Sequence, residues 1–149
     1  MKTDLKGLNA RETEQWAMAN GLEPYRGRQI RHWLLNRLAV SCDEMQNLPK
    51  PVRTLVRESA LIAPLEEITT LTSEDGTRKY LFRLQDGHLI ESVLIPERDH
   101  LTLCISSQAG CAMGCRFCLT GKQGFKRDLA PSEIIEQIIP VSYTHLTLP

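Results

Sequence analysis

Three of the five cysteines fall within one short segment, at Cys111, Cys115 and Cys118, with the spacing C-x3-C-x2-C. Thiolates are the usual protein ligands of iron–sulfur clusters, and this spacing lets one loop place three of them around a cubic cluster. A 4Fe-4S cluster has four irons, so three protein ligands leave one iron open for a chelating small molecule. Gly110 and Gly114 reduce backbone crowding beside the metal. The motif therefore predicts a 4Fe-4S cluster with one open coordination position.

Two other interpretations of these cysteines are a structural zinc site and a set of buried thiols that only pack. Structural zinc normally takes four ligands, usually as two separated pairs. The sequence holds no second C-x2-C pair and no H-x3-H pair. A fourth ligand from Cys104 would need an unusual approach to the metal. The iron–sulfur cluster is therefore the favoured interpretation.

The composition is that of an ordinary globular protein, with 149 residues of which 42% are hydrophobic and 24% charged. Lys and Arg number 18, as do Asp and Glu, so the net charge gives no argument for a nucleic-acid or membrane partner. No charged and then apolar leader follows Met1, and no apolar run approaches the roughly twenty residues of a membrane span. Cysteines without a secretory leader favour metal or redox chemistry. We expect a cytoplasmic protein with no membrane partner.

The elements that must position the cysteines follow from the hydrophobic periodicity. As far as Ala63 the pattern is helical, with helices expected over 5–20, over 25–38 and after Pro51. From about 65 to 107 the pattern changes to period two, which predicts strands with a hairpin turn at Asp86-Gly87.

The cysteine loop, about 108–127, follows a predicted strand over 101–107 and precedes a predicted helix over about 132–139. One such βα unit cannot close a sheet or cover both of its faces, which predicts further strands downstream. Without those strands, the helix should expose its isoleucines, at positions 134, 135, 138 and 139, and the chain should aggregate.

Two more side chains are candidates for chemistry. Leu89, Glu91, Val93 and Ile95 share one face of a predicted strand, which places a carboxylate in an apolar row. An unpaired acid there is costly, so Glu91 is either a functional carboxylate or an outward-facing residue, and the strand pattern does not decide between them. Cys104, on the strand before the loop, is either a reactive thiol or a packed small hydrophobe.

Six further blocks accompany the cysteine motif: PYRGRQI at 24–30, DEMQNLPK at 43–50, ESVLIP at 91–96, CISSQ at 104–108, QGFKR at 123–127 and SEIIEQ at 132–137. With the motif, these blocks closely resemble the 23S ribosomal RNA adenine-C2 methyltransferases, which are radical S-adenosylmethionine enzymes that also act on some transfer RNAs. The resemblance covers nearly the whole chain. The cysteines alone indicate only the superfamily, and the flanking blocks narrow it to this family.

The resemblance implies an α/β fold in successive parts. Residues 1–63 would form a small helical accessory domain that binds RNA, and 64–100 a β-hairpin connector. Residues 101–140 would begin a radical S-adenosylmethionine partial (β/α)6 barrel, truncated here. Residues 141–149 depart from the family pattern and look like a translated sequencing adaptor, so we expect natural sequence to stop near Pro140. The fragment alone is expected to be inactive, because the remaining strands and the methyl-carrying cysteine are absent from it.

The resemblance also implies a mechanism and site residues. In that family one S-adenosylmethionine methylates a cysteine near the carboxyl end, a second is cleaved reductively at the open iron, and the methyl carbon, as a radical, adds to C2 of the adenine. Another cysteine then resolves the protein–RNA crosslink by forming a disulfide bond. Cys104 sits at the position of this resolving cysteine, and Glu91 at that of a glutamate that contacts the target base. Phe117 sits at the position of an aromatic that binds the cofactor adenine, although it could equally pack in the core.

The implied partners are 23S rRNA, tRNA and an electron donor such as flavodoxin, for a protein expected to be a monomer. Two basic stretches without acids, 24–42 and 116–127, are candidates for phosphate contacts. Two other functions stay open. One is a related methyltransferase that acts at C8 of the adenine, and the other is a metal-stabilised RNA-binding module without catalysis.

Overall fold

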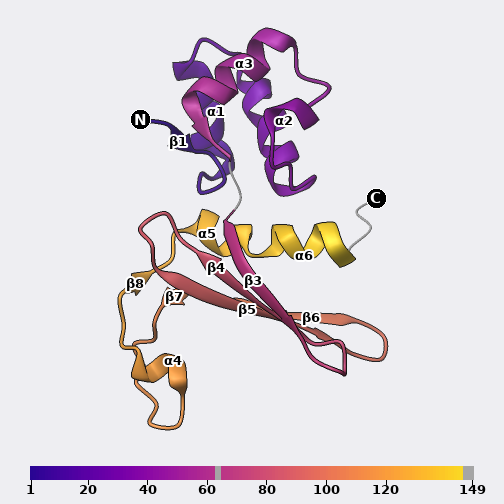
Figure 1. Cartoon of the computed structure of the whole chain (residues 1–149). Coiled ribbons are helices and arrows are strands. Elements are labelled where there is room, and N and C mark those ends of the chain that lie inside the picture. Colours follow the sequence, from indigo (N-terminus) through magenta and orange to yellow (C-terminus); the bar gives the residue numbers. More distant parts are fainter. Residues whose placement is uncertain (63–64, 146–149) are drawn as a thin grey trace. The chain divides into compact units, whose positions relative to one another are not determined.

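The computed structural model describes residues 1–62 and 65–145, with side chains as far as residue 142 (Figure 1). The chain forms two compact units, one of residues 1–62 and one that begins at Leu65. Each unit has a hydrophobic core of its own. Among the described residues, none of the helices combines the length and the apolarity needed to cross a membrane.

The first unit is built from three helices, α1 (Ala10–Ala19), α2 (Pro24–Leu35) and α3 (Lys50–Ser59), with a short 3-10 helix η1 (Cys42–Glu44). Two short strands, β1 (Thr3–Asp4) and β2 (Ala60–Leu61), pair in parallel. The three predicted helices are confirmed, but the first begins five residues later than expected. Asn9 and Glu12 form a capping box there, with Glu12 N–H donating to Asn9 Oδ1 at 2.9 Å.

The second unit contains an antiparallel sheet of four strands in the order β3 (Glu66–Thr72), β4 (Arg78–Arg83), β5 (Leu89–Pro96) and β6 (Leu101–Cys104). The predicted turn at Asp86-Gly87 joins β4 to β5, and Gly87 has a φ of +85°, which glycine adopts readily. Val93 of β5 lies opposite Cys104 of β6. The strand that precedes the cysteine loop therefore belongs to the same sheet as the hairpin.

The cysteine loop lies between two short strands, β7 (Gln108–Ala109) and β8 (Arg127–Asp128), which pair in antiparallel fashion, and it carries the short helix α4 (Leu119–Lys122). Figure 1 shows this loop extending from the β7–β8 end of the unit. The order of strand, cysteine loop and helix is as predicted.

After the loop come two helices, α5 (Pro131–Glu136) and α6 (Ile138–His145), where the sequence predicted one. Pro140 explains the break, since it has no N–H to donate to the carbonyl four residues earlier and its ring crowds that turn. The expected exposure of the isoleucine face was wrong for Ile139, which is 2% exposed. Ile134, Ile135 and Ile138 are half-buried, and Ile134 packs against the core of the sheet. α6 continues beyond the boundary predicted at Pro140, and residues 146–149 lie outside the described residues.

Candidate functional site

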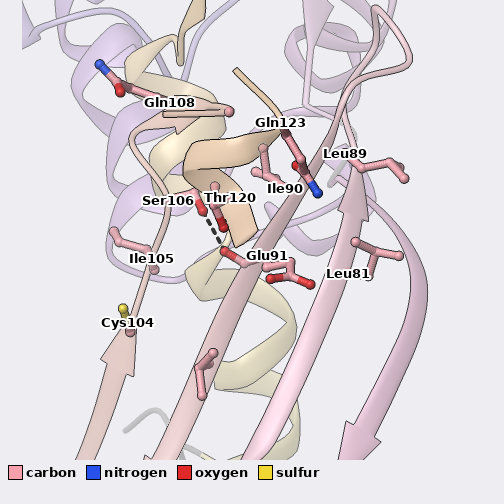
Figure 2. Close-up of a pocket in the computed structure, with 12 residues that line it drawn as sticks. Leu81, Leu89, Ile90, Glu91, Cys104, Ile105, Ser106, Gln108, Thr120 and Gln123 are labelled. Atoms are coloured by element: carbon pink, nitrogen blue, oxygen red, sulfur yellow. Dashed lines mark hydrogen bonds between the residues drawn. The ribbon is translucent and has the colours of Figure 1, made fainter. Parts of the chain in front are cut away.

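The outer face of the sheet in the second unit carries a hollow of about 270 Å³ that brings Glu91 and Cys104 together. Along β5, Ile90, Ser92 and Leu94 are buried, so Glu91 points to the opposite face. Figure 2 shows Glu91 from β5, Cys104 from the end of β6 and residues of the cysteine loop around this hollow. The residues that line it are Leu81, Leu89, Ile90, Glu91, Val93, Cys104, Ile105, Ser106, Gln108, Gly110, Thr120 and Gln123.

Glu91 is an accessible carboxylate with a cationic neighbour. Its Oε1 lies 2.8 Å from Nζ of Lys79 on the adjacent strand, and both side chains are nearly half exposed. A pair this exposed is worth little to stability, since water screens it. The backbone carbonyl of Glu91 accepts a hydrogen bond from Ser106 Oγ at 2.7 Å (Figure 2). The carboxylate therefore carries no large burial cost and remains able to accept hydrogen bonds from a ligand.

Cys104 is an exposed thiol, which makes it reachable from solvent. It is the last residue of β6, and the packed interpretation of this side chain does not hold. Cys42, by contrast, is buried in the first unit, and burial raises the pKa of its thiol. All five cysteines are free thiols in the part of the chain that the structure describes.

The base of the cysteine loop is closed by backbone contacts. Lys126 N–H donates to the Ala109 carbonyl at 2.9 Å, next to the β7–β8 pair. Gly110 has a φ of +74°, and a Cβ added there would lie 1.9 Å from the carbonyl oxygen of Gly124. Only glycine fits this close approach of the two ends of the loop.

The three motif cysteines are half-buried in this loop. At the start of α4, the backbone N–H groups of Gly121 and Thr120 lower the pKa of the Cys118 thiol. Thiolates are the form that binds metal, so the loop supplies donors of the right chemistry for an iron–sulfur cluster. Across residues 1–62 and 65–142, whose side chains the structure describes, no three His, Cys, Asp or Glu side chains are gathered closely enough to hold a metal ion. Metal binding couples to local folding, and the cluster itself would draw the thiolates together.

Phe117 lies in the same loop and is 92% exposed, so it is not packed in the core. Met113 and Leu119 are exposed as well. Large apolar side chains that gather at a loop tip usually mark a contact with a ligand or with another part of a protein.

Sequence reasoning missed Gln137, which lies between α5 and α6 and is fully buried. Its Oε1 accepts from Ser92 Oγ at 2.7 Å and from Ser106 N–H at 2.8 Å, and its Nε2 donates to the Ser106 carbonyl at 2.8 Å. The amide thus pairs with Ser106 as a neighbouring strand would. The only signal in the sequence was a polar residue that interrupts the isoleucine face.

Each of the two basic stretches contains an arginine whose charge is already paired with a carboxylate. In 24–42, Arg28 is paired with Glu14 of α1 at 2.8 Å. In 116–127, Arg127 is paired with two carboxylates. A further basic face, which the sequence analysis did not single out, lies on α3, where Lys50, Arg53 and Arg57 follow helical spacing.

That α3 face surrounds a shallow depression of about 230 Å³ lined by Asp43, Lys50, Arg53, Thr54 and Arg57. Arg57 pairs with Asp43 at 2.6 Å. Arg53 Nε is buried and has no hydrogen-bond partner among the described residues. The face therefore gathers three cationic side chains around one depression, a combination suited to an anionic ligand.

Comparisons with known proteins bear on both units. Residues 3–62 match the family model of the ribosomal RNA large subunit methyltransferase N-terminal domain. The dual-specificity RNA methyltransferase RlmN of Desulfosudis oleivorans is 51% identical over 136 residues, which are 91% of this chain and 37% of the relative. That of Geobacter sulfurreducens is 51% identical over 138 residues, or 93% of this chain and 38% of the relative. The chain belongs to the RlmN family. It spans little more than a third of the length of these relatives.

A solved structure extends the match to the fold of this RlmN family member. The crystal structure of a radical SAM methyltransferase from Sphaerobacter thermophilus superposes with a TM-score of 0.87 and 39% identity. The match covers 95% of this chain and 42% of that one. The chain is thus an α/β part of a protein similar to a radical SAM methyltransferase.

Proposed function

We propose that the whole protein is a radical S-adenosylmethionine methyltransferase that places a methyl group on C2 of an adenine in 23S rRNA and in some tRNAs, through a methyl-cysteine intermediate. The observation that carries this proposal is the hollow that Glu91 and Cys104 share with Gly110, Thr120 and Gln123 of the cysteine loop. Such a reaction needs three parts close together: a carboxylate that contacts the base, a thiol that can be reached, and the loop that holds the cluster.

In this proposal Cys111, Cys115 and Cys118 hold a 4Fe-4S cluster, with one iron open to S-adenosylmethionine. When bound, the cluster supplies the electron that cleaves S-adenosylmethionine reductively. Phe117, already exposed on the loop, would pack against the adenine of that cofactor. The donor chemistry of the three thiols and the lowered pKa of Cys118 support this ligand set.

Glu91 would accept a hydrogen bond from the exocyclic amino group of the target adenine, since an ionised carboxylate only accepts. Nζ of Lys79, 2.8 Å from Oε1 of Glu91, places a positive charge beside this carboxylate. Cys104 would resolve the protein–RNA crosslink by attacking the sulfur of the crosslinked cysteine. As the disulfide bond forms, the bond from that sulfur to the methylene carbon would break, and the carbon, now held by the RNA, would take up a proton to become the methyl group. The exposure of Cys104 at the end of β6 supports that role, because thiol exchange requires access.

The first unit would be the RNA-binding accessory domain, and the α3 face would contact phosphates of rRNA or tRNA. The sheet would be the connector joined to the first strand of a partial (β/α)6 barrel, with β6, the cysteine loop and α5 as its start. We also propose a cytoplasmic monomer that receives electrons from a donor such as flavodoxin, and a non-native tail after Pro140. By itself, the 149-residue chain would not complete methyl transfer.

Anaerobic reconstitution of the chain with iron and sulfide, followed by electron paramagnetic resonance, tests the cluster. We expect a reduced 4Fe-4S signal whose shape changes when S-adenosylmethionine is added. The Cys118→Ala variant should lose the signal, and Cys42→Ala, which removes a buried thiol from the other unit, should keep it. Zinc retention without any cofactor-dependent signal would contradict the proposal and favour a non-catalytic RNA-binding module. Mass spectrometry of RNA modified by a version extended to the length of the relatives would separate C2 from C8 methylation.

A further inference from the structure

Arg127 forms ion pairs with two carboxylates of the second unit, those of Asp86 and Glu133. Its Nε lies 2.6 Å from Asp86 Oδ2, and its Nη1 and Nη2 each lie 2.8 Å from one oxygen of Glu133. The pair with Glu133 is therefore a two-bond fork. The Arg127 side chain is 33% exposed and that of Glu133 only 15%, so water screens this pair less than the others in the unit.

These three residues come from three different elements, and Asp86 lies 41 positions before Arg127 in the sequence. Arg127 is the first residue of β8, where the cysteine loop ends. Asp86 lies in the turn between β4 and β5, and Glu133 lies in the first turn of α5. One guanidinium group thus ties the returning end of the loop both to the sheet and to the helix that covers it.

The other side-chain bonds at the base of the loop come from Gln108, whose Nε2 donates to Asp128 Oδ1 at 2.9 Å and whose Oε1 accepts from Ala112 N–H at 3.2 Å. The tip of the loop exposes Met113, Phe117 and Leu119 instead of burying them, and the two strands at its base are two residues long. Lys126 N–H to Ala109 and Leu129 N–H to Ser107, both at 2.9 Å, are the backbone bonds that flank Arg127. Short antiparallel pairs of this kind are marginal by themselves.

Helix α5, which carries Glu133, is also bonded to the residues that line the hollow. Glu133 and Gln137 are one helical turn apart, and Gln137 Nε2 donates to the Glu133 carbonyl at 3.2 Å. Gln137 holds Ser106, which in turn donates to the backbone of Glu91. The same short helix is therefore bonded to the base of the loop and to the strands that carry Glu91 and Cys104.

We propose that Arg127 is a positioning residue that fixes the cysteine loop relative to the hollow by pairing with Asp86 and Glu133. This inference rests on the proposed function only in the statement that the loop holds an iron–sulfur cluster. The anchoring itself is a property of the metal-free chain and can be measured without any cluster.

Hydrogen exchange of the metal-free, full 149-residue chain tests the anchoring. Arg127→Met should speed exchange of the Lys126 and Leu129 amides about tenfold, as expected for the loss of a local contact network. Arg83→Met is the matched control, because it removes another arginine ion pair of the same unit, that with Glu66 at 3.2 Å. Arg127→Lys, which keeps the charge and loses the fork, should give an intermediate rate. Wild-type exchange rates at both amides in Arg127→Met would overturn the inference.

Cluster assembly provides a second measurement that separates positioning from general stability. Ser142→Ala removes a buried hydroxyl that donates to the Ile138 carbonyl at 2.9 Å, away from the loop. If the two variants lower the melting temperature of the chain by the same amount, Arg127→Met should still bind less than about half the iron that wild type binds per chain. Ser142→Ala should bind as much iron as wild type. Equal iron in both variants, or complete unfolding of both Arg127 variants, would contradict a positioning role. If wild-type chain binds no cluster, the proposed function fails, and the exchange rates still decide the anchoring.

Discussion

The acidic residues of the second unit serve two different purposes, and their surroundings distinguish them. Glu91 is nearly half exposed, pairs with a single lysine and faces a hollow. Glu133 is mostly covered and accepts both bonds of an arginine fork, with Ala130 N–H donating to it as well at 2.8 Å. The first arrangement leaves a carboxylate free to bind a ligand, and the second uses up its acceptors. At this scale Glu91 is suited to binding and Glu133 to holding the fold.

The paired acids should make the second unit sensitive to acid. The hydrogen bonds from Arg127 lower the pKa of Glu133 from 4.5 and of Asp86 from 3.8. A carboxyl with a lowered pKa in the folded state adds stability above its ordinary pKa, and that stability is lost as the pH falls through the lowered value. We therefore expect the melting temperature of wild-type chain to fall between about pH 5 and pH 3 more steeply than that of Arg127→Met. Parallel melting curves over this range would show that the ion pairs do not stabilise the unit.

At the scale of elements, hydrophobic periodicity predicted the helices, strands and turns that depend on residues close together in the sequence. The three helices of the first unit, the hairpin turn at Asp86-Gly87 and the order of strand, loop and helix were all predictable, since each depends on local patterns. The break at Gln137 follows from Pro140, a local signal that the prediction of a single helix overlooked. The cover over the isoleucines was not predictable, because it depends on how the helix packs on the sheet. The sequence also did not determine which side of β5 faces the core. The face with Ile90 and Leu94 is as apolar as the face that contains Glu91.

The site followed the same division. The cysteine motif and the resemblance placed Glu91 and Cys104 as candidates, and the fold brings both to one hollow. The pairing of Arg127 with Asp86 joins residues 41 positions apart, which no local pattern reveals. The unused donor of Arg53 is likewise visible only once the burial of its Nε is known.

The closure of the cysteine loop predicts a contrast between two glycines. Gly110 and Gly114 both have positive φ, so alanine pays a similar backbone cost of about 1 kcal/mol at either position. Only at Gly110 would the new Cβ also meet a backbone oxygen, that of Gly124, at 1.9 Å, whereas nothing lies within 4 Å at Gly114. Gly110→Ala should therefore bind less than about half the iron of Gly114→Ala on reconstitution, because the ends of the loop are pushed apart. Equal iron binding in the two variants would mean that the close approach is not needed.

At the scale of the molecule, the chain joins two units with separate cores. The first unit buries residues such as Ile30, Leu34 and Val56 without help from the sheet, and it is the part that matches the N-terminal domain model. The second unit carries the hollow and the cysteine loop. In the proposed enzyme the chemistry therefore lies on one unit, and the α3 face lies on the other. An RNA that contacts both units would be bound by two separate sets of residues, so that a substitution in one set leaves the other set intact.

The α3 face makes this division measurable through salt. Each phosphate contact that a protein makes steepens the dependence of RNA affinity on salt, so removing one contacting cation should reduce the slope of log affinity against log salt by about 1. We expect this result for Lys50→Met and for Arg53→Met when the full chain binds a short RNA stem-loop, measured by fluorescence anisotropy. Arg28→Met is the control, since Glu14 already pairs with that charge at 2.8 Å, and its slope should stay close to that of wild type. If Arg28→Met lowers the slope as much as Arg53→Met does, the helix α2 stretch binds the phosphates instead. An unchanged slope in Lys50→Met and Arg53→Met would remove α3 from the RNA interface and leave the hollow on the sheet unaffected, because the two units do not share these residues.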